Sequence, residues 1–188
     1  VVKSKSMATE EIHLNEVLRE DGIDVQETDL GEFINAISGD TPVHMVMPAI
    51  HLNKEQCAGF FSEELKEDIP SDIPYMIHTA RRVLREEFLS ADMGITGANF
   101  GIAENGAIGL VTNEGNARLV TTMPRIHVVI LGYEKLIPKI EDAAKILRLL
   151  PRNGTCQRMT SYMTMVDGPT PVICKKDGKM VEENRKQY

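Results

Sequence analysis

Short apolar segments alternate with longer amphipathic segments along most of this chain, and this alternation restricts its fold more than any other feature. Apolar runs of strand length predict strands at residues 1–3, 23–25, 43–47 and 126–131. Apolar residues at helical spacing predict helices at residues 9–19, 30–37, 53–65, 75–90 and 137–150. Strands that alternate with helices form right-handed βαβ units. We therefore expect an α/β fold of three layers, with a mainly parallel sheet between helices.

Capping residues and prolines mark the ends of several predicted helices. Asp29 and Asn53 are expected N-caps, because a short polar side chain can accept hydrogen bonds from the free N–H groups of the first turn. Gly39 is expected to end the helix that follows Asp29. Pro138 and Pro151 are expected to begin and end the last helix.

Residues 94–118 are rich in glycine and short β-like runs. Asn105-Gly106 predicts a two-residue hairpin turn between residues 100–102 and 108–110. A second hairpin is predicted near the end of the sequence, around Asp177-Gly178. In such segments the backbone shapes the surface more than side-chain bulk does.

Length and charge limit the size of the fold and the class of partner. The chain has 188 residues, of which 42% are hydrophobic, and this is enough for one domain over residues 1–188 with a sizeable core. Its formal net charge of −7 argues against a nucleic-acid partner, because binding to phosphate backbones needs a basic face. The first residue is Val1 rather than Met, so we expect the chain to belong to a longer protein.

The length of the apolar runs indicates whether the chain can cross a membrane. The spacing of the cysteines indicates whether it can form disulfides or hold a metal centre. The densest apolar run, residues 126–131, is too short to cross a bilayer, so no membrane span is expected. Cys57, Cys156 and Cys174 are far apart and form no Cys-x-x-Cys pair, so no disulfide framework, zinc site or iron–sulfur site is expected within this chain. A reducing, cytoplasmic location fits this cysteine usage best.

The first candidate site is the segment Lys3, Ser4, Lys5 and Ser6, which lies where a strand gives way to a helix. Backbone amides at a helix start, two ammonium groups and two hydroxyls suit an anion such as a phosphate, a carboxylate or a pyrophosphate. The alternative is that both lysines are solvated and a serine only caps the helix.

The second candidate site is the acidic segment 27–32, again at a strand-to-helix junction. Its carboxylates could hold a sugar hydroxyl, bind a cation or act as a general base, with Glu27 and Glu32 the functional groups and Asp29 the cap. Carboxylates in a first helical turn are also favoured by capping and by the helix dipole alone.

The third candidate site is the glycine-rich stretch, whose polar candidates are Thr96, Gly97, Asn99, Glu104, Asn116 and Arg118. Glycine lets backbone amides approach a ligand, Glu104 could be a base or nucleophile, and Arg118 could bind a carboxylate through two hydrogen bonds. The alternative is two hairpins with asparagines in their turns.

No metal site is expected from the histidines. His44 and His51 flank a predicted strand, but no third ligand accompanies them. The chain also lacks the G-x-G-x-x-G, G-x-S-x-G and H-E-x-x-H motifs, which removes the usual support for dinucleotide binding, serine hydrolysis and zinc-protease chemistry.

Several of these motifs together resemble the lactate utilisation protein B family. They are KSKSM at residues 3–7 with Glu11 and Asn15, ETDLGE at 27–32, PAIH at 48–51, GITGANFGIAENG at 94–106, NEGNAR at 113–118 and PRIH at 124–127. They occur in the right order over about residues 1–150. The resemblance implies a lactate-utilisation (LUD) domain with a fold like ribose-5-phosphate isomerase, glucosamine-6-phosphate deaminase and CoA transferases.

The resemblance also implies a role in oxidising L-lactate to pyruvate, with a small carboxylate such as lactate as substrate and sister subunits as partners. Electrons would leave through [4Fe–4S] clusters in a cysteine-rich part that follows this domain and is absent here. In this picture Lys5 and Arg118 neutralise the carboxylate, Glu104 or Glu27 takes the hydroxyl proton, and Asn99 orients the substrate, all near one cleft.

Two other functions stay open. One is isomerase or acyl-CoA transferase chemistry on a phosphorylated or CoA substrate, with Glu104 as base or nucleophile. The other is a non-catalytic module that docks the subunits of a lactate-oxidising complex. Whether the chain is itself an enzyme stays open at this point.

Overall fold

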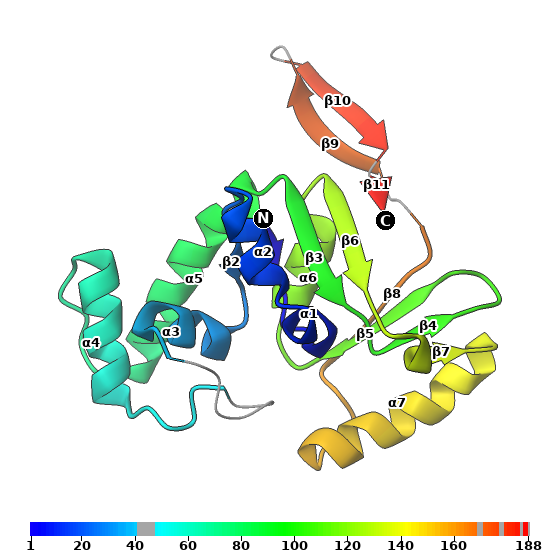
Figure 1. Cartoon of the computed structure of the whole chain (residues 1–188), viewed down its shortest axis with the longest axis horizontal. Helices are drawn as coiled ribbons and strands as arrows, with labels where there is room; N and C mark the ends of the chain where they lie inside the picture. Colours follow the sequence, from blue (N-terminus) through cyan, green and yellow to red (C-terminus); the bar gives the residue numbers. More distant parts are fainter. Residues whose placement is uncertain (41–47, 169–170, 177–178, 185, 188) are drawn as a thin grey trace.

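The computed structural model describes residues 1–40, 48–168, 171–176, 179–184 and 186–187. Its centre is a parallel sheet with helices on both faces, and a second, mixed sheet lies beside it (Figure 1). The α/β fold with a mainly parallel sheet is therefore confirmed. The likeness to isomerases and CoA transferases stays a prediction, as does the single domain over residues 1–188.

The parallel sheet contains, in spatial order, β11 (Lys186–Gln187), β6 (Ile126–Ile130), β3 (Met93–Gly97), β1 (Val2–Lys3) and β2 (Gln26–Glu27). Strand β1 pairs with β2 on one side and with β3 on the other, so that Lys3 lies between Glu27 and Ile95. The carboxyl ends of these three strands therefore meet at one edge of the sheet.

The second sheet contains, in spatial order, β7 (Leu136–Ile137), β4 (Phe100–Ile102), β5 (Ile108–Thr112) and β8 (Tyr162–Val166). Strands β4 and β5 pair antiparallel, as the Asn105-Gly106 signal predicted. The turn is longer than the predicted two residues, because the Ile102 N–H bonds to the Ala107 carbonyl and Gly106 adopts a positive φ of 76°. The predicted terminal hairpin is also present, as β9 (Pro171–Lys176) and β10 (Lys179–Asn184), although Asp177-Gly178 lie outside the described residues.

The helices are α1 (Met7–Glu11), α2 (Leu14–Glu20), α3 (Leu30–Ser38), α4 (Lys54–Leu65), α5 (Ile73–Ser90), α6 (Asn116–Thr122) and α7 (Ile140–Thr155), with a 3₁₀ helix at Tyr133–Lys135. Helices α1 and α2 lie in front of the parallel sheet and α6 behind it (Figure 1). The main core joins β1 to α3, α4 and α5 through residues such as Val2, Phe33, Phe61 and Leu84. Helix α7 packs on β4 around Phe100 in a separate core.

Both predicted N-caps, Asp29 and Asn53, are confirmed. The Asp29 carboxylate accepts hydrogen bonds from the N–H groups of Gly31 and Glu32, at 3.1 and 3.2 Å, and starts α3. Asn53 forms a reciprocal capping box with Gln56 at the start of α4. Gly39 ends α3 in the left-handed conformation, as predicted.

Three sequence predictions of element bounds were wrong. The strand predicted at 23–25 lies instead at Gln26–Glu27, where the Gln26 N–H bonds to the Val1 carbonyl. The helix predicted at 9–19 is two short helices, separated by His13 with a φ of 52°. Helix α7 begins at Ile140 rather than at Pro138, continues through Pro151, which is buried, and ends at Thr155. The strand predicted at 43–47 lies outside the described residues.

None of the helices in the described part of the chain has the length and apolar character needed to span a bilayer.

Candidate functional site

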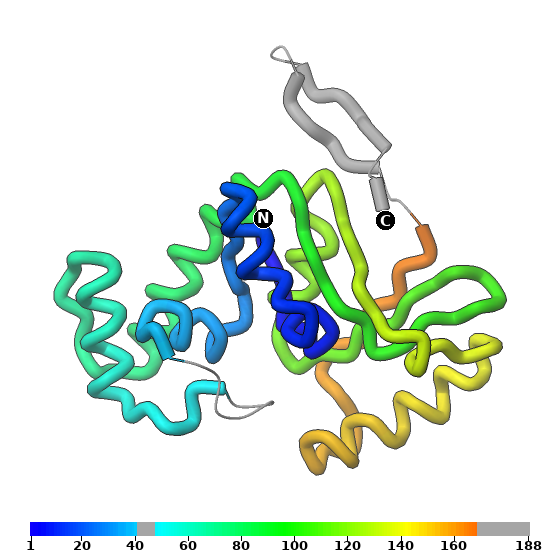
Figure 2. The backbone as a smooth tube through the Cα atoms, viewed as in Figure 1, coloured from blue at the N-terminus to red at the C-terminus, as the bar shows by residue number. Residues whose placement is uncertain are grey.

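The carboxyl ends of β1, β2 and β3 bring the first two predicted candidate segments together. The Thr28 N–H donates to the Lys3 carbonyl at 2.9 Å, and the Ser4 N–H donates to the Ile95 carbonyl at 3.0 Å. The backbone tube shows the segment that follows β1 lying against β3 (Figure 2). Open α/β sheets usually bind ligands at this edge. We call this region the carboxyl edge.

A buried ion pair lies at the centre of the carboxyl edge. The Lys3 side chain is fully buried, and its Nζ donates to Glu27 Oε1 at 2.5 Å and to Glu10 Oε1 at 3.0 Å. Asn15 Nδ2 donates to the same Glu27 oxygen at 2.7 Å. Glu27 Oε2 is buried and has no hydrogen-bond partner among the described residues. One carboxylate oxygen of Glu27 is thus fully used and the other is free.

A second ion pair, between Lys5 and Glu32, lies near the first. Lys5 Nζ is 3.3 Å from Glu32 Oε1, and both side chains are largely buried. The pKa of Glu32 is raised above its ordinary value, mainly because burial removes solvent from the carboxylate. The Lys5 ammonium lowers this pKa, while the Glu27 and Glu10 carboxylates raise it further. Glu32 is therefore more readily protonated than an ordinary carboxylate.

Ser6 and Thr96 are buried where the chain leaves β1 and β3. Ser6 Oγ has no hydrogen-bond partner among the described residues, and a Cβ added at Gly97 would approach that oxygen within 2.5 Å. Gly97 therefore allows the segment after β1 to pack against β3. Thr96 Oγ1 lies 2.9 Å from His127 Nε2, so this threonine is already paired inside the sheet.

A polar cavity of about 300 Å³ opens beside Glu27, between α1–α2 and α3. Its polar lining includes Glu10, Asn15, Glu27, Glu32, Asn35 and Asp40. We call it the acidic cavity. The part of the chain that the structure describes holds no group of three His, Cys, Asp or Glu side chains suited to a metal ion, including at this cavity.

Of the glycine-rich candidates, Thr96 and Gly97 lie at the carboxyl end of β3, whereas the others are exposed or make different contacts. Asn99 Oδ1 accepts a hydrogen bond from the Val111 N–H at 2.7 Å, so its side chain supports the β4–β5 hairpin. Glu104 is exposed in the β4–β5 loop, which lies at the far end of the second sheet from β1 (Figure 1). Arg118 is exposed, and its guanidinium stacks over the Tyr162 ring at 4.8 Å. Asn116 is half-buried at the start of α6.

The structure therefore brings only part of the predicted site together in one place. Lys5 and Glu27 lie together at the carboxyl edge, whereas Glu104 is exposed in the β4–β5 loop. The side chains of Asn99 and Arg118 contact the Val111 N–H and the Tyr162 ring. The cause is the second sheet, which carries the hairpin away from the parallel strands. The loop between β5 and α6, which contains Glu114, does return to the carboxyl edge. The pKa of Glu114 is raised by loss of solvent and by repulsion from Asp29, and is lowered by Lys5.

Sequence reasoning missed several groups of the carboxyl edge. Glu10 and Asn35 carried no motif, and Asn15 was noted only as part of the family resemblance. A signal for Asn35 did exist, because Glu32 and Asn35 are spaced by three residues on the helix face that also carries Ala36. Polar residues at helical spacing on a buried face indicate a shared polar environment.

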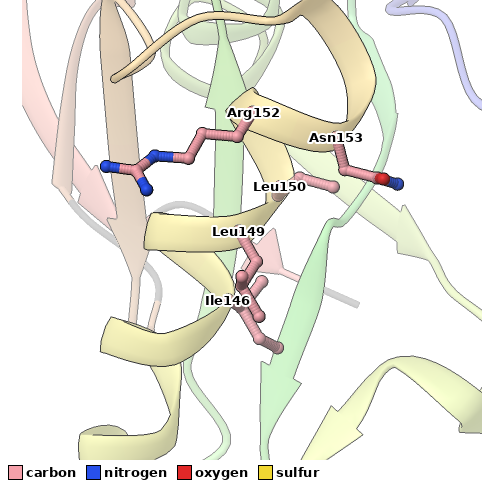
Figure 3. Close-up of a pocket in the computed structure, with 5 residues that line it drawn as sticks. All are labelled: Ile146, Leu149, Leu150, Arg152 and Asn153. Carbon is pink, nitrogen blue, oxygen red and sulfur yellow. The ribbon is translucent and has the colours of Figure 1, made fainter.

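A second hollow lies on the surface of α7, with a volume of about 590 Å³. Figure 3 shows Ile146 and Leu149 on one side of the helix, with Arg152 and Asn153 near its end. This lining is mostly apolar and Leu149 is exposed. It lacks the paired acids and bases of the carboxyl edge, so we place the candidate site at the latter.

A family model and a set of similar proteins both assign the chain to the same family. The family model described as the LUD domain matches residues 1–184. Among the relatives, Lactate utilization protein B of Macrococcus caseolyticus is 50% identical over 170 residues, and those of Bacillus subtilis and Geobacillus kaustophilus are each 48% identical over 170 residues. Each alignment covers 90% of this chain and 36% of the relative. The chain thus spans about a third of the length of these relatives.

A solved structure is also similar. It is a DUF162 family protein from Deinococcus radiodurans, 17% identical, which covers 86% of this chain and 89% of its own, with a TM-score of 0.34. A likeness of this size has no bearing on function.

Proposed function

This chain belongs to the LUD domain family, and we propose that it is the LUD domain of a longer lactate utilisation protein B-like component that oxidises L-lactate to pyruvate. The observation that carries this proposal is the 48–50% identity to proteins named Lactate utilization protein B, over 90% of the chain. The proposal includes a cytoplasmic location and sister subunits as partners.

The chemistry of the carboxyl edge is compatible with a 2-hydroxy acid. Oxidation of lactate removes two electrons and two protons, one from the hydroxyl and one from C2. Lys5 would neutralise the substrate carboxylate, since it is partly exposed and is paired with one carboxylate, whereas Lys3 is fully buried and is paired with two. Glu32, with its raised pKa, is a better acceptor for the hydroxyl proton than Glu27, whose Oε1 is held by Lys3 and Asn15.

The two electrons would pass to an acceptor outside this chain, and the proton from C2 would be released to solvent. The proposal assigns [4Fe–4S] clusters to the remaining part of the longer protein. The proposal places no cluster in this chain, because Cys57, Cys156 and Cys174 are far apart in the sequence and form no Cys-x-x-Cys pair. We therefore derive no step through a cluster in this chain.

The isomerase and transferase alternatives gain no support, because exposed Glu104 has no cationic or basic partner among the described residues. Nor does any contact within the described part of the chain favour a purely structural docking role.

The site assignment is tested by steady-state kinetics of the full-length protein, with L-lactate and an artificial electron-accepting dye. Lys5→Gln is expected to raise the KM for L-lactate about tenfold or more, because a charge-assisted contact to the carboxylate is lost. Lys145→Gln, on exposed α7, is the matched control and should leave KM unchanged. An unchanged KM in Lys5→Gln would contradict the assignment, even if the protein oxidises lactate.

A further inference from the structure

The acidic cavity contains more free hydrogen-bonding atoms than a closed polar core would. Asn35 is 2% exposed and lines the cavity, yet neither its Oδ1 nor its Nδ2 has a partner among the described residues. Glu27 is 6% exposed, and its Oε2 is equally free. Asn15 Oδ1, also in the lining, has no partner. Buried polar groups are normally paired, because leaving one unpaired costs about 1–3 kcal/mol.

These atoms define the hydrogen-bonding pattern of a missing ligand. Glu27 Oε2, Asn15 Oδ1 and Asn35 Oδ1 are acceptors, so the ligand must donate to them. Asn35 Nδ2 is a donor, so the ligand must also present an acceptor. A hydroxyl group does both, and two or more adjacent hydroxyls would satisfy the whole set.

From this pattern we propose that the acidic cavity binds a polyhydroxylated group, a sugar or a ribose, through Glu27, Asn35 and Asn15. The cavity volume of about 300 Å³ is at the lower end of the range for small-molecule sites. It is much larger than lactate requires. The inference does not depend on the proposed lactate function, since it rests only on the free atoms and the space around them.

Other classes of ligand match the cavity less well. An anion would meet the five carboxylates of Glu10, Glu16, Glu27, Glu32 and Asp40 against one guanidinium, Arg19, and the imidazole of His13. The nearby Lys3 is already bound to Glu27 and Glu10. An alkylammonium ion would satisfy the acceptors but leave the Asn35 N–H₂ group unpaired. A metal ion lacks a set of three suitable side chains among the described residues.

The test is a titration of the ¹⁵N-labelled chain followed by NMR, with D-ribose, n-butylammonium chloride and L-lactate as separate probes. D-ribose is expected to shift the backbone amide signals of α3 and of residues 26–28 in a saturable way. Asn35→Leu should weaken this binding about tenfold or more, because it removes one donor and one acceptor while keeping the shape of the side chain. Asn153→Leu, an exposed asparagine on α7, is the matched control and should bind as the wild type does.

Three results would overturn the inference. They are no saturable shift with D-ribose, saturable shifts at the cavity only with the ammonium ion or only with lactate, and unchanged D-ribose binding in a folded Asn35→Leu variant. Circular dichroism of Asn35→Leu establishes that it is folded. None of these results bears on lactate-dependent dye reduction by the full-length protein, so the two proposals fail separately.

Discussion

At the scale of single residues, the carboxyl edge depends on a buried positive charge. Lys3 Nζ binds both Glu27 and Glu10, and the Lys3 side chain has no access to solvent. Burying a lysine is costly unless its charge is compensated, and here two carboxylates compensate it. The arrangement keeps one oxygen of Glu27 occupied and leaves the other without a partner among the described residues, in a side chain that lines the acidic cavity.

Replacing Lys3 by methionine is expected to lower the free energy of unfolding by about 3–5 kcal/mol, because Glu27 would remain as an uncompensated buried carboxylate. Urea denaturation measures this change. The double variant Lys3→Met with Glu27→Met should recover most of the loss, since no buried charge is then unpaired. A double variant less stable than Lys3→Met alone would contradict this explanation.

Glu32 should make stability depend on pH. Its pKa in the folded chain is raised above 4.5, so the folded state favours the protonated carboxyl. The resulting stabilisation is fully present below the unfolded pKa and is lost as pH rises through the raised folded pKa. The free energy of unfolding of the wild type, minus that of Glu32→Gln, should therefore fall with rising pH above about 4.5. Denaturation at a series of pH values measures it, and a difference that rises with pH would show that the Lys5 attraction outweighs desolvation.

Asn35 is expected to decrease stability in the absence of ligand. Its unpaired amide group is buried, so Asn35→Leu should raise the free energy of unfolding by about 1 kcal/mol or more. Thermal denaturation without added sugar measures this. A gain in stability together with a loss of D-ribose binding would mark a residue retained for binding, whereas a loss of stability would mean that Asn35 has a structural role.

The sequence allowed some of these residues to be predicted and not others. Lys5 and Glu27 were predicted because each lies next to the end of a short strand, where α/β folds place ligands. Glu104 and Arg118 were expected at the same cleft because their motifs are rich in polar groups and glycine. Composition alone does not show that the second sheet carries Glu104 away from the parallel strands, or that Arg118 stacks on Tyr162.

At the scale of elements, helix ends were the most predictable features. Asp29 and Asn53 cap α3 and α4 as expected, because capping is a local interaction between a side chain and the next few N–H groups. The last helix was less predictable. Pro151 lies inside α7 because burying its ring offsets the lost backbone hydrogen bond, and burial depends on the tertiary fold.

The end of α4 gives a test of local backbone conformation. Lys66 is exposed and adopts a positive φ of 54°, which glycine tolerates much better than lysine. Lys66→Gly is expected to raise the free energy of unfolding by about 1 kcal/mol. Glu63→Gly, in the same helix at ordinary helical φ, is the control and should lower it by about 1 kcal/mol. Equal losses of stability in both variants would show that Lys66 is not strained.

At the scale of the whole molecule, the alternation of strands and helices was sufficient to predict a mainly parallel α/β fold. It was not sufficient to predict two sheets, because the pairing of β7 with β4 and of β5 with β8 joins segments far apart in sequence. The chain spans 36% of the length of its relatives, so its activity is proposed as that of the longer protein.

The most direct test of the central claim is anaerobic purification of the full-length protein beside this chain, followed by L-lactate-dependent reduction of an artificial dye. We expect the full-length protein to reduce the dye with L-lactate and to contain iron and sulfide, whereas residues 1–188 alone contain neither and do not reduce the dye. A full-length protein that holds no iron–sulfur cluster and does not respond to L-lactate would contradict the proposed function.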